Sequence, residues 1–179
     1  MEDISMPNKA YVMIYTVTGA EMWVLIGRNV NTPPGRRPVR TYGYATFPGG
    51  SEANTDYTFR DTVIRECREE TGINISRLIT PITGHPPGGE NVQYFTVYVT
   101  MAYLRELCAQ ANNYIRGLQN VEVNNFCIVK IGAGCNIAQS LFAHHELDWH
   151  HWAISRLSYR PFLTQALRPV WPAPDTVEI

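Results

Sequence analysis

The chain has 179 residues, of which 45% are hydrophobic and only 17% are charged. This length and composition predict a single α/β domain over 1–179, with a core over about 9–167 and a surface tail over 168–179. The formal net charge of −1 argues against capture of nucleic acid or an anionic membrane by a broad basic surface.

Targeting signals are missing from the sequence as given. No stretch approaches the roughly 20 apolar residues of a membrane span, and residues 1–8 lack the apolar core of a secretory signal. The cysteines form no CxxC pair, which favours free thiols over a disulfide framework. They are Cys67, Cys108, Cys127 and Cys135. These observations together predict a cytoplasmic protein.

Extended segments dominate the first part of the chain. Residues 11–17 and 22–26 are rich in β-branched and aromatic residues and flank a short turn, which predicts a β-hairpin. Residues 31–40 contain three prolines and three arginines, a composition that predicts an exposed basic loop. Residues 42–47 return to an extended, aromatic pattern that leads into Pro48, Gly49 and Gly50.

A helix with signals at both ends follows this turn. Thr58 and Asp61 have the spacing of a capping box, and Gly72 stands where a left-handed residue would end the helix. Farther along, the pattern predicts strands over 94–103 and 121–131 and helices over 104–118 and 154–167.

Three glutamates gather at the end of the first predicted helix. Glu66, Glu69 and Glu70 stand at positions i, i+3 and i+4, so they share a face, and this face also carries Val63 and Cys67. Carboxylates there repel one another and oppose the negative end of the helix dipole. A divalent cation removes these costs, and an all-oxygen ligand set suits Mg²⁺ or Mn²⁺. The alternative is a solvated charged face.

These residues resemble a known family. The segments 47–50 (FPGG) and 65–73 (RECREETGI) are similar to the Nudix box, GX5EX7REUXEEXGU, in which U is aliphatic. Cys67 replaces one aliphatic residue. Counting forward from Gly50 places Asp56 at the first box glutamate, whereas counting back from Arg65 places Tyr57 there. One residue therefore looks inserted, and we expect the loop to depend little on either side chain.

The resemblance implies a fold and a catalytic site. It implies an α/β/α sandwich around a mixed sheet, in which Glu66, Glu69 and Glu70, helped by the carbonyl of Gly49, hold Mg²⁺ or Mn²⁺. Arg65 can fix Glu69 by an i,i+4 ion pair. The resemblance leaves the proton acceptor open. The candidates are Glu66 on the helix, Glu146 in a late loop and, third, Glu90.

Residues before the box are candidates for substrate binding. The guanidinium groups of Arg36, Arg37 and Arg40 match phosphate oxygens, although a solvated loop is the plainer interpretation. Tyr42 and Tyr44 alternate along an extended segment and are candidates for stacking on a nucleobase. The histidine-rich segment 144–151 lacks the HExxH spacing, so we do not expect zinc there.

The function implied by the resemblance is Mg²⁺-dependent hydrolysis of a nucleoside diphosphate linked to another group. Pro86 and Pro87, about fifteen residues after the box, slightly favour ADP-ribose or a nucleotide sugar. Nucleoside triphosphates, dinucleoside polyphosphates and capped RNA stay open as substrates, as does a homodimer. Two rivals remain: a Nudix-fold module that binds nucleotides without cleaving them, and a structural domain with coincidental acids.

Overall fold

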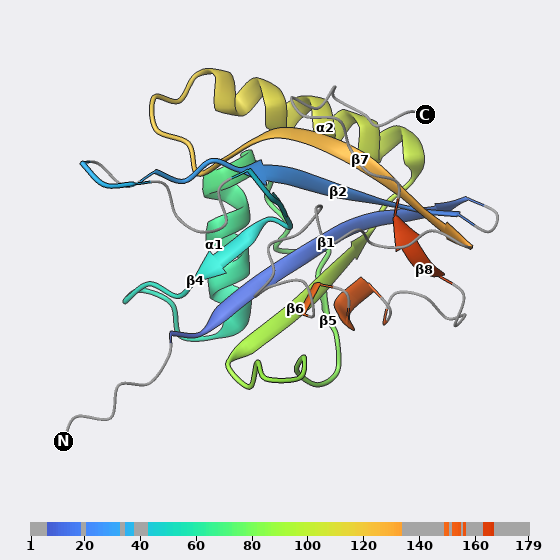
Figure 1. The fold of residues 1–179 in the computed structure, drawn as a ribbon, viewed down its shortest axis with the longest axis horizontal. Helices are drawn as coiled ribbons and strands as arrows, with labels where there is room; N and C mark the ends of the chain where they lie inside the picture. The colour runs from blue at the N-terminus through green and yellow to red at the C-terminus, as the bar shows by residue number, and fades with distance from the viewer. Residues whose placement is uncertain are drawn as a thin grey trace.

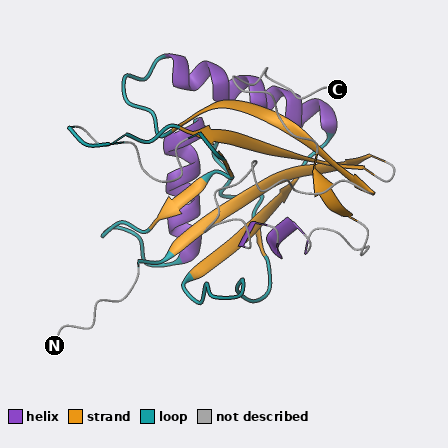
Figure 2. Cartoon of the chain, in the orientation of Figure 1, coloured by secondary structure: helices purple, strands orange, loops and turns teal. Residues whose placement is uncertain are grey.

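The computed structural model describes residues 7–18, 21–32, 35–37, 43–133, 149–150, 152–154, 156 and 163–166. Within them lie the strands β1 (Lys9–Thr18), β2 (Glu21–Asn29), β3 (Ala45–Thr46), β4 (Gly49–Ser51), β5 (Thr80–Pro81), β6 (Val92–Tyr98), β7 (Val123–Ala133) and β8 (Leu163–Ala166). The helices are α1 (Phe59–Thr71) and α2 (Met101–Arg116). Figure 2 shows how helices, strands and loops follow one another.

The described strands form one mixed sheet in the order β5-β6-β1-β2-β7-β8, with β3 paired to β2 and β4 to β1. β1 and β6 are parallel, whereas the other pairs are antiparallel. Figure 1 shows β4 crossing in front of α1, and these two elements are in contact. The sheet thereby brings the glycine turn at β4 against the helix that carries the predicted acidic face.

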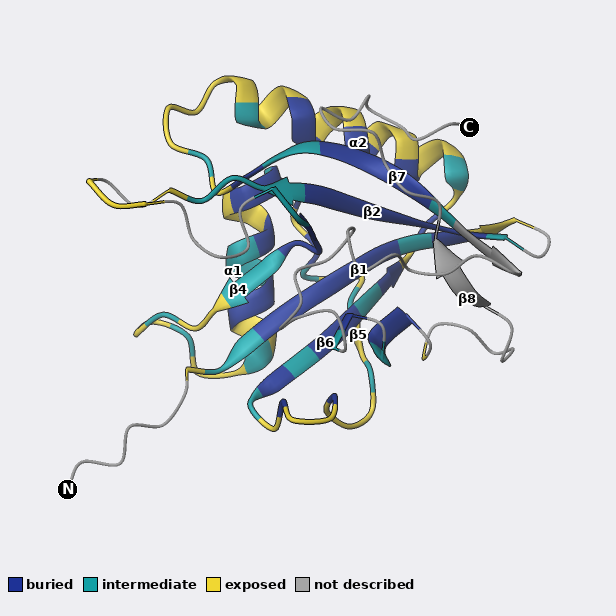
Figure 3. Cartoon of the chain, viewed as in Figure 1, coloured by how far each residue is buried: buried dark blue, intermediate teal, exposed yellow. Residues whose placement is uncertain are grey.

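Apolar residues cover both faces of the sheet, as alternation along the strands requires. One face packs against α1 and α2 through residues such as Val12, Ile14, Leu25, Phe95 and Phe126. The opposite face buries a second cluster, including Met13, Met22, Phe47, Tyr94 and Ile154, the last of these from the short helical segment 152–154. This is the layered α/β arrangement expected from the sequence, and Figure 3 shows buried residues along the central strands and many exposed residues on α2.

The predicted elements agree with this fold in most places. The hairpin is present, with Thr18 opposite Glu21. α1 begins with the expected capping box, in which the Thr58 side chain accepts a hydrogen bond from the Asp61 amide, and it ends at Gly72 with φ of 73°. The described cysteines (Cys67, Cys108 and Cys127) are free, as predicted, and all three are buried.

Two predicted boundaries were wrong. The strand over 94–103 ends at Tyr98, because the Thr100 side chain accepts from the Tyr103 amide and starts α2 at Met101. The helix over 154–167 is also wrong in its second half, where residues 163–166 form β8. Pairing with the edge of β7 determines this strand, and helical periodicity cannot report such a contact.

Other expectations are only partly covered by the described residues. The extended segment over 42–47 is a strand only at Ala45–Thr46, after Gly43 with φ of 88°. The expected surface tail over 168–179 lies outside the described residues. Among the residues that are described, no helix has the length and apolar character needed to cross a membrane.

Candidate active site

The glycine turn packs its backbone directly on the acidic face of α1. The Gly49 amide donates a hydrogen bond to Glu70 Oε1 at 3.1 Å. A Cβ atom at Gly50 would stand 2.8 Å from the carboxyl carbon of Glu66. Gly49 itself has φ of 150°, and a side chain there would collide with Ala10 and Tyr11 of β1. Only glycines let β4 approach two of the three glutamates this closely.

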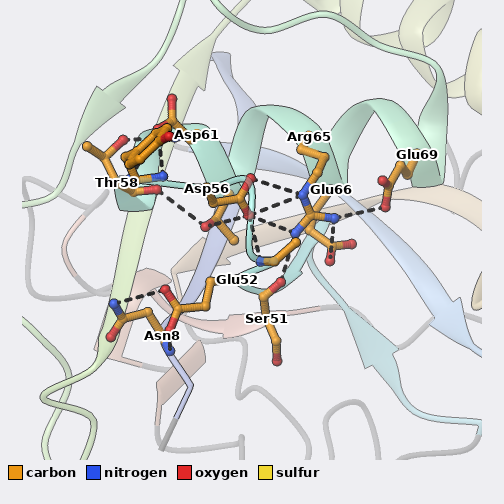
Figure 4. Close-up of polar contacts among 12 residues, drawn as sticks. Asn8, Ser51, Glu52, Asp56, Thr58, Asp61, Arg65, Glu66 and Glu69 are labelled. Atoms are coloured by element: carbon orange, nitrogen blue, oxygen red, sulfur yellow. Dashed lines mark hydrogen bonds and ion pairs between the residues drawn. The ribbon is translucent and has the colours of Figure 1, made fainter.

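Arg65 is the centre of an ionic network on the other side of these glutamates (Figure 4). Its Nη1 atom lies 3.3 Å from Glu66 Oε1 and 3.1 Å from Glu69 Oε2, and the second contact is the predicted i,i+4 pair. Its Nη2 atom donates to the Ser51 carbonyl and to Asp56 Oδ2, both at 2.9 Å. Arg65 therefore fixes the position of two glutamates relative to the loop after β4.

Asp56 corrects the expectation that the loop depends little on its acid. Its carboxylate pairs with Arg65, accepts from the Ala53 amide at 2.9 Å and accepts from the Thr62 hydroxyl at 3.1 Å. The side chain of Asp56 is 5% exposed, whereas Tyr57 is 93% exposed. Of the two residues that counting offered for the first box acid, Asp56 is therefore the one that contacts Arg65, whereas Tyr57 is turned outward.

The three helix glutamates differ in burial. Glu70 is buried, the side chain of Glu66 is 13% exposed, and that of Glu69 is 58% exposed. The predicted inward face is therefore confirmed for Glu66 and Glu70, while Glu69 lies at its rim. This difference follows from the helix wheel, because Glu66 and Glu70 stand closest to the line of Val63 and Cys67.

A cavity of about 230 Å³ opens beside these glutamates, and a fourth carboxylate belongs to it. Glu122 lies in the short connection between α2 and β7. The cavity is lined by Glu66, Glu69, Glu70, Glu122, Asn120 and the apolar residues Ile115, Leu118, Val121 and Val123. This described lining contains four carboxylates and no lysine or arginine, so it favours a positively charged ligand.

The electrostatics of the cavity disfavour ionised glutamates. Burial raises the pKa of Glu66 from its usual 4.5 to about 7, and the Glu69 and Glu122 carboxylates add to this although Arg65 opposes it. Burial likewise raises the pKa of Glu70 well above its usual value, helped by Glu66. By contrast, the hydrogen bond from Arg65 lowers the pKa of Asp56. Arg65 only partly offsets the effect of burial on the Glu66 pKa, and at Glu70 the opposing contact is the hydrogen bond from the Gly49 amide.

The donor set of this cavity fits a hard divalent cation. All four acidic side chains offer oxygen ligands, which Mg²⁺ and Mn²⁺ prefer, and a cation would offset both the desolvation and the mutual repulsion of Glu66 and Glu70. As they stand, the described residues include no group of three or more His, Cys, Asp or Glu side chains placed to hold a metal ion. The ion pairs of Arg65 account for the present orientation of Glu66 and Glu69.

A comparison with family models identifies the chain. The NUDIX domain model matches residues 7–129, which is more than half of the sequence and includes α1 with its glycine turn. The chain belongs to the NUDIX family. A search of curated proteins returned no match.

Solved structures of similar fold include other NUDIX proteins. A MutT/nudix family protein from Enterococcus faecalis is 12% identical, with a TM-score of 0.49 over 91% of this chain and 68% of that one. The NUDIX domain of Shewanella oneidensis NrtR, solved with ADP ribose, is 17% identical, with a TM-score of 0.39 over 54% of this chain and 62% of that one.

A third match is the MERS1 protein of T. brucei in its apo form. It is 25% identical, with a TM-score of 0.39 over 52% of this chain and 38% of that one. The present chain spans less than two thirds of the length of each of the first matched structures.

The remaining predicted site residues are only partly placed. Arg36 and Arg37 are exposed, and Tyr44 is partly exposed, with its carbonyl accepting from the Asn29 amide at the end of β2. Glu90 is exposed and is not among the residues that line the acidic cavity. Arg40, Tyr42 and Glu146 lie outside the described residues, so their roles stay predictions.

Only Trp149 and His150 of the histidine-rich segment 144–151 are described. His150 is fully buried, and its Nδ1 atom lies 2.6 Å from the Tyr94 hydroxyl oxygen, within an aromatic cluster that includes Tyr11 and Phe47. These contacts give His150 a packing role in the second core. That the segment does not bind zinc stays a prediction.

Sequence reasoning missed Glu122. The residue precedes an apolar strand and matches no part of the family motif, so nothing in its neighbourhood sets it apart from a surface acid. Only the fold, which brings the connection between α2 and β7 beside α1, reveals its place among the carboxylates. The pattern of α1 alone therefore underestimates the negative charge of the site.

The raised pKa of Glu66 predicts a pH-dependent stability. Without divalent cations, the folded state retains a proton between pH 4.5 and about 7 that the unfolded state has lost, so stability is highest below this window and falls as the pH rises through it. We expect the advantage of Glu66→Gln over the parent to grow by about 3 kcal/mol from pH 4 to pH 8. Urea unfolding in EDTA measures it, and a constant difference would contradict the assignment.

Proposed function

We propose that this NUDIX chain hydrolyses the diphosphate bond of a nucleoside diphosphate linked to a second group, using Mg²⁺ or Mn²⁺. The observation that carries the proposal is the cavity beside buried Glu70 and largely buried Glu66, whose described lining has four carboxylates and no basic residue. Ionised carboxylates in such a site lose hydration and repel one another unless a cation is bound. A divalent cation that also binds phosphate oxygens suits these ligands.

The four glutamates would hold the cation, with Glu70 oriented by the Gly49 amide and Glu69 by Arg65. A bound divalent cation would neutralise diphosphate charge and lower the pKa of a coordinated water. Glu66 lines the cavity, which supports it as the proton acceptor, whereas Glu90 does not line it and Glu146 lies outside the described residues. Glu146, in a late loop of the chain, stays the alternative candidate for the proton acceptor.

We also propose which group is linked to the nucleoside diphosphate in the substrate. ADP-ribose or a nucleotide sugar is the leading candidate, supported by Pro86 and Pro87 after the box. The NrtR structure with ADP ribose and a MERS1 structure with GDP concern other proteins, and we use these ligands here only as probes. Small nucleotides are favoured over nucleic acid because the net charge of the chain is −1.

The direct test is turnover of a nucleotide panel with product identification. The panel contains ADP-ribose, nucleotide sugars, nucleoside triphosphates, a dinucleoside polyphosphate and capped RNA, each with and without Mg²⁺. We expect Mg²⁺-dependent release of a nucleoside monophosphate from at least one nucleoside diphosphate derivative. Binding without turnover would instead indicate a non-catalytic NUDIX module, and neither binding nor turnover would indicate a structural domain.

The basic loop is expected to bind substrate phosphate. Arg36→Ala, Arg37→Ala or Arg40→Ala should raise KM by up to about tenfold with little change in kcat, because an electrostatic contact made equally in the ground and transition states affects binding alone. The effect should shrink at high salt, since exposed charges are screened within about 8 Å at physiological ionic strength. Arg105→Ala, an exposed arginine on α2, is the control.

Steady-state kinetics at low and high salt separate these outcomes. Arg→Lys substitutions should restore part of the lost affinity, since an ammonium keeps the charge but not the planar fork. If all three alanine variants keep the parent KM at low salt, the loop is only a solvated connection.

A further inference from the structure

Part of the acidic cavity is lined by apolar residues. Its carboxylates come from α1 and from Glu122, whereas the rest of its described lining is aliphatic apart from Asn120. Figure 1 shows the connection between α2 and β7, which supplies much of this lining, close to one end of α1. We call the four aliphatic residues the apolar wall: Ile115, Leu118, Val121 and Val123.

Two residues of the apolar wall do not belong to the protein core. Ile115 packs against the core cluster under α1 and α2, and Val123 is a member of it. Leu118 and Val121 are in neither of the core clusters that the described residues form, and Leu118 is 40% exposed. A single exposed leucine is ordinary on a protein surface, but this one lines a cavity that also contains four carboxylates. A ligand in that cavity therefore gains affinity by covering it.

Backbone hydrogen bonds hold the connection between α2 and β7 at both of its ends. The Leu118 amide donates to the Ile115 carbonyl at 3.1 Å, which continues the last turn of α2. The Val30 amide, just after β2, donates to the Glu122 carbonyl at 2.8 Å. The apolar wall is thus preorganised, so a ligand that packs on it does not first have to order this segment.

The size of the cavity limits how much of a substrate it can hold. Its volume of about 230 Å³ is below the roughly 300–1,000 Å³ of pockets that enclose a whole small-molecule ligand. Part of a nucleoside diphosphate derivative fits, with phosphates beside a cation at the glutamates and an apolar group at the apolar wall. When the second group is a sugar, the phosphates, the ribose and the sugar are all polar. The nucleobase is then the part of the substrate with an apolar face.

We propose that Leu118 and Val121 form the nucleobase subsite, in which their side chains pack against the flat face of the base while the diphosphate lies at the glutamates. One ribose separates the base from the first phosphate, so both can contact the lining of one small cavity. The inference rests on the proposed function, because it assumes that phosphates bind at the acidic cavity. It goes beyond that function by assigning the residues that hold the base. Packing on the face favours purines, which offer the larger area.

The test measures how much the base contributes to binding. Calorimetry in Mg²⁺ compares the Kd values of ADP, GDP, CDP and UDP with that of ribose 5-diphosphate, which lacks a base. The parent should bind ADP and GDP at least tenfold more tightly than ribose 5-diphosphate, with CDP and UDP between them. Leu118→Ser should reduce this ratio about fivefold without changing the Kd of ribose 5-diphosphate. Leu118→Met, which keeps an apolar side chain of similar volume, should keep the parental ratio.

Leu78→Ser is the matched control, because Leu78 is 48% exposed and does not line the acidic cavity. It should leave every Kd unchanged. If the parent binds no nucleoside diphosphate more tightly than ribose 5-diphosphate, or if Leu118→Ser keeps the parental ratio, the inference is overturned. A lower melting temperature of Leu118→Ser together with a parental ratio would show that protein, rather than substrate, covers the apolar wall.

Failure of this inference can be distinguished from failure of the proposed function. If Leu118→Ser reduces the ratio although the nucleotide panel shows no turnover, the base subsite stands and the proposed hydrolysis fails. If the panel shows Mg²⁺-dependent turnover while Leu118→Ser keeps the ratio, hydrolysis stands and the base lies elsewhere.

Discussion

Glu70→Gln and Glu66→Gln are each expected to lower turnover by a factor on the order of 10³ or more. Glutamine keeps the shape of the side chain, and at position 70 its carbonyl oxygen can still accept from the Gly49 amide. The negative charge is lost, however, and with it most of the attraction for a divalent cation. The two variants should fold as the parent does, with a higher melting temperature at pH 8 because carboxylate repulsion is relieved.

A matched control distinguishes loss of the site from a general charge effect. Glu106 is an exposed acid on α2 and does not line the acidic cavity, so Glu106→Gln should keep parental turnover. Glu69→Gln is expected to resemble the cavity variants, with a smaller gain in stability because this side chain is more exposed. Parental turnover in both Glu66→Gln and Glu70→Gln would reject the cavity as the active site.

Asp56→Ala is expected to have the second-largest effect, on both stability and turnover. The substitution removes the ion pair with Arg65 and the acceptor for the Ala53 amide and Thr62 hydroxyl. We expect a loss of about 2 kcal/mol in the free energy of unfolding, or about 4–8 °C in melting temperature. Turnover should fall more than tenfold, because Arg65 would no longer hold Glu66 and Glu69 against the loop.

Tyr57→Ala is the natural control for this prediction. Counting back from Arg65 places Tyr57, rather than Asp56, at the first glutamate of the box. Its side chain, however, is 93% exposed. It should change neither the melting temperature nor kcat/KM appreciably. Equal effects of the Asp56 and Tyr57 substitutions in thermal unfolding and steady-state kinetics would show that the Asp56–Arg65 contact does not organise the loop.

Local sequence signals predicted the helix at the site well. Thr58, Asp61 and Gly72 define both ends of α1 through contacts within a few residues, so the sequence was sufficient for its position. The inward direction of Glu66 and Glu70 followed from helical periodicity. The i,i+4 contact between Arg65 and Glu69 is equally local, and it too was predicted.

Features that depend on distant parts of the chain were not predictable in the same way. The ion pair of Asp56 joins it to Arg65, nine residues later, and depends on how the loop folds back on α1. Glu122 acquires its place among the carboxylates because the chain returns beside α1 at the start of β7. β8 forms by pairing with β7, which overrides the helical pattern of residues 163–166.

Titration of the protein with Mn²⁺, followed by the electron paramagnetic resonance signal of the free ion, tests the central claim directly. It requires no knowledge of the substrate and reports binding at the acidic cavity. We predict that the parent protein, titrated without nucleotide, removes Mn²⁺ from solution and that Glu70→Gln does so at least tenfold more weakly. Equal depletion of the free-ion signal by both proteins, or no depletion by the parent, would contradict a divalent-cation site on this helix.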